Sequence, residues 1–155
     1  MSRAFVKEQD GEAGDAFPEL AVSPHRNLVT PEGLEQLDDN LRRLDADLSR
    51  ARSAGDRSWV ARIERDRRYW SRRRATAELV PKPVGPHEPV RFGSQVTLER
   101  PDGRRTVFRI VGEDEAEPSA GRVSWVSPLA ESLLGAVVGD LVPFQGDQAE
   151  IVGID

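Results

Sequence analysis

Leucine recurs along one stretch of this chain at alternating spacings of three and four residues. In an α-helix this spacing places the side chains on a single stripe, and most other positions of the stretch are Asp, Asn, Gln or Arg. An apolar stripe on a polar helix is stabilised by burial. The pattern therefore predicts a helix that packs against a partner along Leu34, Leu37, Leu41, Leu44 and Leu48.

The next segment of the chain is predicted to be that partner. One of its helical faces carries apolar side chains, at Trp59, Ile63, Trp70 and Ala77, with Val60 and Tyr69 beside them. A connection of a few residues around Gly55 makes the two helices antiparallel neighbours. The first helix is rich in acids and the second in arginines, so ion pairs between them are expected to help fix the register, at about 0 to 1 kcal/mol each.

Residues that start and stop helices delimit this hairpin. Thr30 is expected to accept a backbone N–H at the start of the first helix. Gly55 lets the chain turn, and Asp56 caps the returning helix, a role that contributes about 1 kcal/mol. Prolines then end the hairpin and form a stiff linker, because each lacks a donor and restricts the residue before it. They are Pro81, Pro83, Pro86 and Pro89.

The last third of the chain is typical of short strands. VRFGSQVTLERPDGRRTVFRIVG predicts two strands joined at an Asp-Gly turn, and RVSWVS predicts a third. SPLAESLLG predicts a short helix capped by Ser127 with Pro128 at its first position, and DLVPF and AEIVGID predict closing strands. The fold class is therefore α+β with two domains, an antiparallel helical hairpin and a mainly antiparallel sheet with one short helix.

Four parts follow from these boundaries. We expect a disordered or loosely ordered arm over residues 1–28, the helical hairpin over 29–80, the Pro-rich linker over 81–89 and the sheet domain over 90–155.

Composition excludes several classes of function. The 155 residues include no cysteine and only two histidines, so a disulfide framework and thiolate metal ligands are excluded. No apolar run approaches the roughly 18 residues that span a bilayer, and no signal peptide is evident, so we expect a soluble cytoplasmic protein without a membrane partner. The usual enzyme motifs, including glycine-rich phosphate loops and Ser-His-Asp sets, do not occur.

Charge is distributed unevenly around a formal net value of −5. A run of arginines in the second helix is compatible with nucleic-acid binding, although the same residues are better explained as partners of the acids on the first helix. They are Arg65, Arg67, Arg68, Arg72, Arg73 and Arg74. An acidic stretch over residues 113–117 is compatible with a hard metal site, but we interpret it as a solvated turn.

Several motifs of the sheet domain carry a family resemblance. VRFGSQVT at 90–97, FRIVGEDEA at 108–116, VSWVSPLA at 123–130, LLG at 133–135 and VGD at 138–140 resemble the C-terminal domain of the bacterial Gre transcript cleavage factors, the GreA/GreB family. The hairpin resembles the N-terminal coiled coil of that family. The resemblance implies an FKBP-like C-terminal fold that docks on core RNA polymerase at the rim of its secondary channel, while the coiled coil enters the channel.

The resemblance also implies a role for the hairpin tip. In the family a Gly-Asp-Leu-Ser-Glu-Asn type motif supplies two acids that help to hold a catalytic Mg²⁺ jointly with the polymerase, for hydrolysis of backtracked RNA. Here Gly55, Asp56 and Ser58 match, but Trp59 stands at the glutamate position. The hairpin is also shorter than usual by roughly nine or ten residues per arm, which withdraws the tip by about 14 Å.

Three hypotheses follow. The first is a modulator of RNA polymerase that acts by occupying the channel as a monomer, without a cofactor of its own and with nascent RNA nearby. The second is a factor that stimulates cleavage, with Asp56 as the catalytic acid and Asp47 or Glu64 in support. The third is an FKBP-like peptide-binding module or prolyl isomerase unrelated to transcription. For docking, the resemblance points to Val126, Ser127, Pro128 and Leu129.

Overall fold

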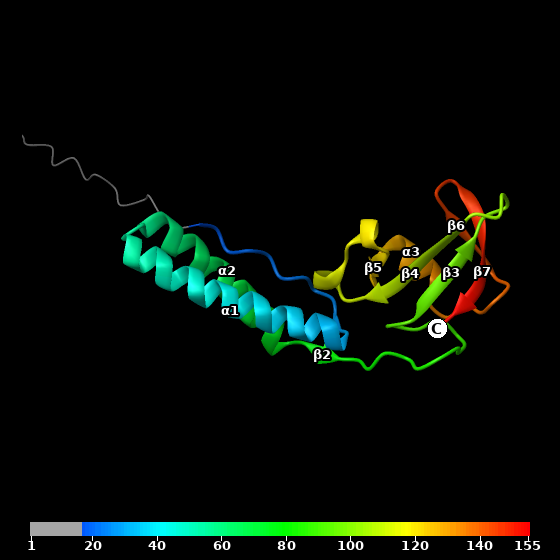
Figure 1. Cartoon of the computed structure of the whole chain (residues 1–155), viewed down its shortest axis with the longest axis horizontal. Coiled ribbons are helices and arrows are strands. Elements are labelled where there is room, and N and C mark those ends of the chain that lie inside the picture. Colours follow the sequence, from blue (N-terminus) through cyan, green and yellow to red (C-terminus); the bar gives the residue numbers. More distant parts are fainter. Residues whose placement is uncertain (1–16) are drawn as a thin grey trace, which may run out of the picture.

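Two paired helices and a small sheet domain lie end to end in this molecule (Figure 1). The computed structural model describes residues 17–155. Residues 1–16, which form the first part of the arm predicted over 1–28, lie outside the described residues. In the part of the chain that the structure describes, no helix is both long enough and apolar enough to cross a membrane.

The first arm of the hairpin is α1, which spans Pro31–Ala54. It begins as predicted, because the Thr30 hydroxyl accepts a hydrogen bond from the Gly33 N–H at 3.1 Å and satisfies a donor that a helix leaves unpaired. It ends at Gly55, whose φ of 69° lies in the left-handed region that glycine adopts without strain.

The second arm is α2, which spans Arg57–Ala75. The Asp56 carboxylate caps it by accepting a hydrogen bond from the Trp59 N–H at 2.9 Å, as the sequence predicted. The helix ends earlier than its apolar pattern indicated, because Thr76 closes it. Ala77 therefore lies beyond the helix and does not belong to the packed face.

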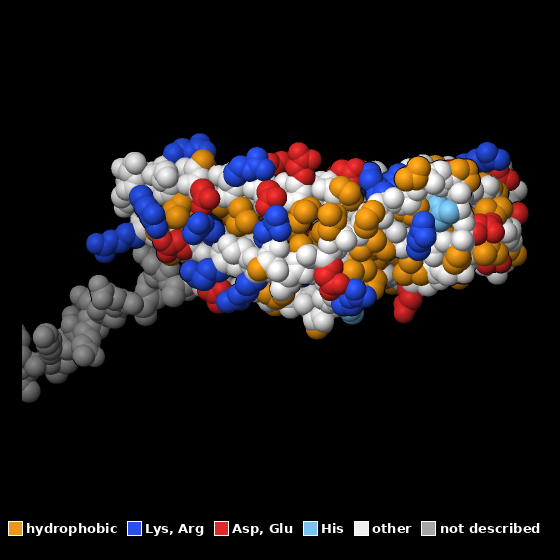
Figure 2. Space-filling view, turned by 90° about the horizontal axis from the view of Figure 1, so that it is seen from below, with side chains coloured by type: hydrophobic (Ala, Val, Ile, Leu, Met, Phe, Trp, Pro, Cys, Tyr) orange, Lys and Arg blue, Asp and Glu red, His pale blue; other side chains and the backbone are white. Residues whose placement is uncertain are grey.

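The leucine stripe packs α1 against α2. Leu44, Leu48 and Ala51 are buried together with Ile63, and partly buried aromatic side chains from α2 complete the cluster. Two ion pairs of the expected polarity cross between the helices, from Arg67 to Asp45 and from Arg74 to Asp38, both at 2.6 Å. A third runs the other way, from Arg52 of α1 to Glu64 of α2 at 3.1 Å. Positive and negative side chains are interspersed over this half of the surface (Figure 2). Because these pairs are exposed, burial of the stripe supplies most of the stability.

Residues 17–27, here called the strap, run beside α2 toward the sheet domain (blue in Figure 1). They lead into β1 (Leu28–Val29), which pairs in parallel with β2 (Glu78–Leu79). The described part of the predicted loose arm is thus fastened down, and Asn27 is only 5% exposed. Asn27 contacts Arg73 and Thr76, which are far away in the sequence. Such contacts produce no periodic pattern in the sequence, so this order could not be predicted.

The sheet domain has five strands in the order β5-β4-β3-β7-β6. Neighbouring strands are antiparallel except β4 and β5, which are parallel, in agreement with the α+β class and its mainly antiparallel sheet. The elements are β3 (Gln95–Glu99), β4 (Arg105–Val111), the 3-10 helices η1 (Glu113–Glu115) and η2 (Pro118–Ala120), β5 (Arg122–Ser124), α3 (Pro128–Leu133), β6 (Leu141–Phe144) and β7 (Asp147–Ile154).

The first strand of this domain begins later than its sequence predicted. Instead of extending from Val90, β3 starts at Gln95. The Val90 N–H donates to the carbonyl of Ala136 at 2.8 Å, and Gly93 turns the chain with a φ of 84°. The residues before β3 therefore fasten the linker to the segment that follows α3.

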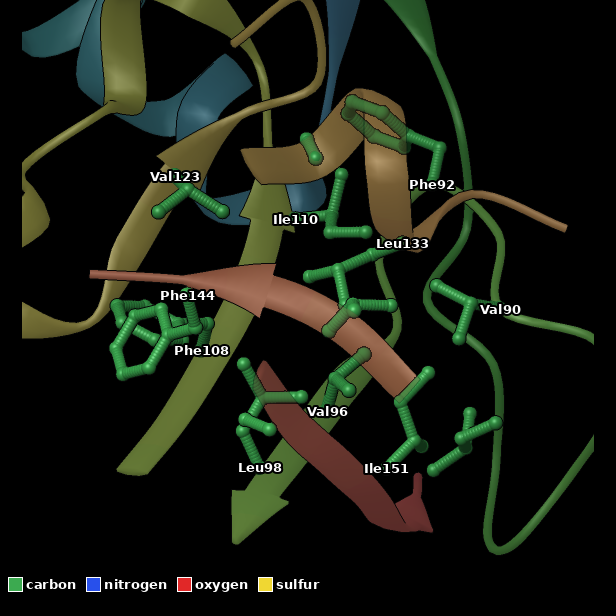
Figure 3. Packing of buried hydrophobic residues seen from close by; sticks show 14 residues of the cluster. Val90, Phe92, Val96, Leu98, Phe108, Ile110, Val123, Leu133, Phe144 and Ile151 are labelled. Carbon is green, nitrogen blue, oxygen red and sulfur yellow. The ribbon is translucent and has the colours of Figure 1, made fainter. Parts of the chain in front are cut away.

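The core of the domain lies between the sheet and α3 (Figure 3). Along β3, Val96 and Leu98 are fully buried while the residues between them are only partly covered, the alternation expected for a strand with one buried face. Ile110, Ile151 and Leu133 bring β4, β7 and α3 to the same centre with 0% exposure.

Candidate functional site

The tip of the hairpin presents Asp56, the predicted catalytic acid. Asp56 is exposed, and its carboxylate already accepts a hydrogen bond from the Trp59 N–H. Phe17, Ser58 and Arg62 join these two residues around a shallow hollow of about 330 Å³. The described tip therefore combines one carboxylate with an aromatic side chain at the position where the resemblance implies a second acid.

The two supporting acids are engaged elsewhere. Asp47 pairs with Arg50 at 2.8 Å, and Glu64 pairs with Arg52 at 3.1 Å. Neither of them lines the hollow beside Asp56. Over residues 17–155, no group of three or more His, Asp or Glu side chains is arranged to hold a metal ion.

The predicted docking residues lie at the other end of the molecule, on the sheet domain. Ser127 caps α3 by accepting a hydrogen bond from the Ala130 N–H at 3.2 Å. Ser127, Pro128 and Leu129 line an open groove of about 630 Å³, bounded by β4, η2 and the turn between β6 and β7. Val126 is not among the residues that line it.

The chemistry of the groove suits a protein segment. Phe108 and Phe144 meet edge to face in its lining, with ring centroids 5.5 Å apart. Val107 leaves 45% of its surface exposed there, and hydroxyl and amide groups from Ser127 and Gln145 add polar contacts. An apolar floor with a polar rim is the usual composition of a protein-binding surface.

A third cluster connects the hairpin to the sheet domain and is centred on Glu115. We call this cluster the joint. This residue is only 6% exposed, and its carboxylate accepts hydrogen bonds from the N–H groups of Thr30 and Gly112, each at 3.0 Å, and from the Thr30 hydroxyl. A Cβ at Gly33 would overlap this carboxyl group, and one at Gly112 would overlap the carbonyl of Leu28. The start of α1 and the end of β4 can approach this closely only because both positions are glycines.

Arg73 completes the joint from the side of α2. It is 1% exposed, and its guanidinium donates to Asp114 at 2.6 Å and to the Asn27 side chain at 2.8 Å. The Asn27 amide donates in return to the Arg73 carbonyl at 2.6 Å. The Tyr69 hydroxyl lies 3.4 Å from Asp114, and burial, together with the negative charge of Asp114, raises the pKa of Tyr69.

The first three residues of the acidic stretch over 113–117 are therefore not a solvated turn, and over residues 17–155 the stretch belongs to no group arranged to hold a metal ion. Asp114 binds the buried cation of Arg73, 41 residues away in sequence, and Glu115 binds the backbone of Thr30, 85 residues away. Glu117, in contrast, is exposed and pairs with Arg122. Local composition does not reveal such partners. The signal that was available is Gly33, a poor helix former in the first turn of a helix, which indicates a close approach by another part of the chain.

The arginine run is mostly neutralised within the molecule. Five of its members have carboxylate partners at 2.6 Å, namely Arg65 with Asp66, Arg67 with Asp45, Arg68 with Glu19, Arg73 with Asp114 and Arg74 with Asp38. Only Arg67 and Arg74 pair with acids of the first helix, as predicted. The other three have partners on α2 itself, on the strap and on the sheet domain, so the run is explained by intramolecular pairing more widely than the sequence indicated.

The fold and these sites define a class of protein in which a paired helical hairpin is joined to a sheet domain that carries an open groove. Comparison with known proteins gives the family. Residues 85–154 match the family model described as "Transcription elongation factor, GreA/GreB, C-term".

Relatives extend the match to both domains. The chain is 31% identical over 153 residues to transcription elongation factor GreB of Neisseria meningitidis serogroup B, covering 84% of this chain and 94% of the relative. It is 34% identical over 133 residues to transcription elongation factor GreA of Phenylobacterium zucineum, covering 74% and 85%. Among solved structures, the GreA factor homolog 1 (Gfh1) protein of Thermus thermophilus aligns with a TM-score of 0.41 and 21% identity, over 84% of this chain and 99% of that one.

The protein belongs to the GreA/GreB family of transcription elongation factors. The resemblance expected from the motifs of the sheet domain is thereby confirmed. No relative reported above supports the alternative of a prolyl isomerase or a peptide-binding module unrelated to transcription.

Proposed function

We propose that this protein is an elongation factor that binds core RNA polymerase through the groove of its sheet domain and directs its short hairpin into the secondary channel. The observation that carries the proposal is the groove lined by Ser127, Pro128 and Leu129, which lies within the residues matched by the family model. Val126 is outside the lining, so we restrict the docking contact to the other three predicted residues.

The tip favours action by channel occupancy over supply of a metal-binding acid pair. Asp56 is a single carboxylate, and it is already used to cap α2. Mg²⁺ requires several oxygen ligands in near-octahedral order, and one exposed carboxylate on a short hairpin supplies little of that set. A Mg²⁺ ion near the tip would therefore be held almost entirely by the polymerase.

Docking is tested with Ser127→Arg combined with Pro128→Ala. The arginine fills the groove and the second change removes an apolar contact, so we expect binding to core RNA polymerase to fall at least tenfold. Binding is measured by co-sedimentation and by fluorescence anisotropy of labelled protein. Circular dichroism confirms that the variant is folded, and Glu131→Gln, an exposed change on the same helix that lies outside the groove lining, is the matched control. A folded double variant that binds as well as the wild type excludes this surface.

The action of the tip is tested with Asp56→Asn and Asp56→Ala in a transcript cleavage assay on backtracked complexes. Asparagine retains the cap of α2 but removes the charge, whereas alanine removes both. If the hairpin acts by occupancy, Asp56→Asn behaves as the wild type does, and neither protein stimulates cleavage. Strong cleavage by the wild type that is lost in Asp56→Asn would establish the two-acid hypothesis in its place.

A further inference from the structure

The strap contacts α2 at two points between the tip and the joint. The guanidinium of Arg68 donates twice to one oxygen of Glu19, at 2.9 and 2.6 Å, and these bonds lower the pKa of Glu19. Nearer the tip, the Arg65 guanidinium stacks over the ring of Phe17, 5.4 Å from its centroid. Phe17 also lines the hollow that contains Asp56. The strap thus follows α2 for most of its length.

The same segment then contacts the sheet domain. The Ser23 hydroxyl donates to Glu113 at 2.9 Å, immediately after β4. The ring of His25 meets Trp125 edge to face, with centroids 6.2 Å apart, at the end of β5. These contacts link the strap to the same edge of the domain that carries the buried joint.

The last residues of the strap fasten it to the base of the hairpin. Arg26 pairs with Glu78 of β2 at 2.5 Å, and Asn27 exchanges hydrogen bonds with Arg73 of α2. Going along the chain, the strap is therefore attached first to the middle of α2, then to the sheet domain, and finally to β2 and the C-terminal end of α2. A segment fastened in this way resists rotation of one body relative to the other.

Because the hairpin is long, a small rotation at the joint displaces its tip by a large distance. α1 has 24 residues, which is about 36 Å at 1.5 Å per residue. A rotation of about 10° at the joint therefore displaces the tip by about 6 Å, more than the length of a hydrogen bond. Contacts with the middle of α2, at a distance from the joint, restrain such a rotation more effectively than contacts within the joint itself.

We propose that the strap fixes the direction in which the sheet domain holds the hairpin, with Glu19, Ser23 and His25 as positioning residues. The effect on transcription rests on the proposed function above, whereas the restraint on the joint does not. The groove lies apart from all three residues, so loosening the strap changes where the tip points without changing how the domain docks.

The restraint is measured with a pair of spin labels. Because the chain contains no cysteine, Ser53→Cys near the tip and Gln148→Cys on β7 give two exposed and unique attachment sites. Pulsed electron resonance then reports the distribution of distances between them. In the full chain with Glu19→Arg, Ser23→Ala and His25→Ala, we expect that distribution to become at least twice as broad. Circular dichroism checks that the helix content is retained.

Charge reversal separates this restraint from general damage to the fold. Glu19→Arg alone places two arginines face to face and broadens the distribution, and adding Arg68→Glu restores the pair and narrows it again. A distribution that stays as narrow as the wild type in the triple variant overturns the proposal. Failure of the reversed pair to narrow it overturns the role of Glu19.

The consequence for transcription is measured with the same triple variant. We expect its affinity for core RNA polymerase to stay within twofold of the wild type, while its effect on elongation falls at least fivefold. A broadened distribution with an unchanged effect on elongation also overturns the proposal. If the wild type does not bind polymerase, the proposed function fails, and the distance distributions alone decide the mechanical role of the strap.

Discussion

Glu115 illustrates how much a single buried side chain decides in this molecule. Its carboxylate accepts hydrogen bonds from the start of α1 and from the segment after β4, so it ties its own segment to Thr30, which lies 85 residues away in sequence. A buried acceptor of this kind is stabilising only while its donors are in place. Gly33 provides the space that it occupies.

The space beside Glu115 gives a prediction at the residue scale. Alanine normally stabilises a helix relative to glycine, by about 1 kcal/mol, yet we expect Gly33→Ala to destabilise the protein by about 1 to 3 kcal/mol, because its Cβ overlaps the carboxyl group. Urea denaturation followed by circular dichroism measures the change in the free energy of unfolding.

Glu115→Ala serves as the background for the control. With the carboxyl group removed, Gly33→Ala is expected to be neutral or stabilising, since only helix propensity then remains. An equal loss of stability in both backgrounds would contradict this account of the joint.

The role of a residue was predictable where its partners are near it in the sequence. It was not predictable where the partners come from a distant part of the chain. The caps formed by Thr30, Asp56 and Ser127 bond to N–H groups three residues onward, so the local sequence contains both partners. Arg73 looked like one member of a charged run, because its acidic partner is 41 residues away. For the same reason the Glu115 site was missed, and the prediction of docking residues rests on family resemblance alone.

At the scale of elements, the hairpin was read correctly because its periodicity extends over many turns. Three leucines of the predicted stripe, Leu37, Leu44 and Leu48, are buried, whereas Leu34 and Leu41 are only partly buried. The cross-helix ion pairs are present. The two-residue strands β1 and β2 were missed, because two residues cannot display a period. The start of β3 was misplaced because Val90 and Phe92 are buried like strand residues, but they lie in the irregular segment and turn that precede β3.

The hairpin also gives a prediction about which contacts hold an element together. Leu44→Ala removes buried methyl groups from the helix interface, and we expect a loss of about 2 to 5 kcal/mol. Arg67→Ala removes an exposed ion pair with Asp45, and we expect a change of no more than about 1 kcal/mol. Both are measured by urea denaturation. The account fails if the arginine variant is the less stable of the two.

For the whole molecule, several ion pairs join separate parts of the chain, and their carboxyl groups share one property. Hydrogen bonds from Arg68, Lys82, Arg74 and Arg26 lower the pKa of these groups below the ordinary value. The groups are Glu19 on the strap, Glu32 and Asp38 on α1, and Glu78 on β2.

The direction of these pKa shifts predicts how stability depends on pH. A lowered pKa in the folded state means that the folded protein binds fewer protons than the unfolded one, so the contribution is present above the ordinary carboxyl pKa of about 4. It is lost as the pH falls through the lower folded-state values. We therefore expect the melting temperature to decrease between pH 6 and pH 3, as followed by circular dichroism.

Salt provides the control for this prediction. Because the pairs are largely exposed, about 0.5 M NaCl should screen them and flatten the dependence on pH. A melting temperature that rises on acidification would show that other groups dominate the stability of the molecule.

The glycine at the base of α1 has a consequence for building chimaeras. Exchanging hairpins between family members is attractive, because the two domains look like separable modules. At this seam, however, the incoming helix must offer a residue without a side chain where Gly33 stands, and the recipient must keep the acid that fills the vacant volume. A chimaera that has the acid but not the glycine contains a steric overlap, and one that has the glycine but not the acid contains an unfilled space. Gly33 and Glu115 should therefore be transferred together.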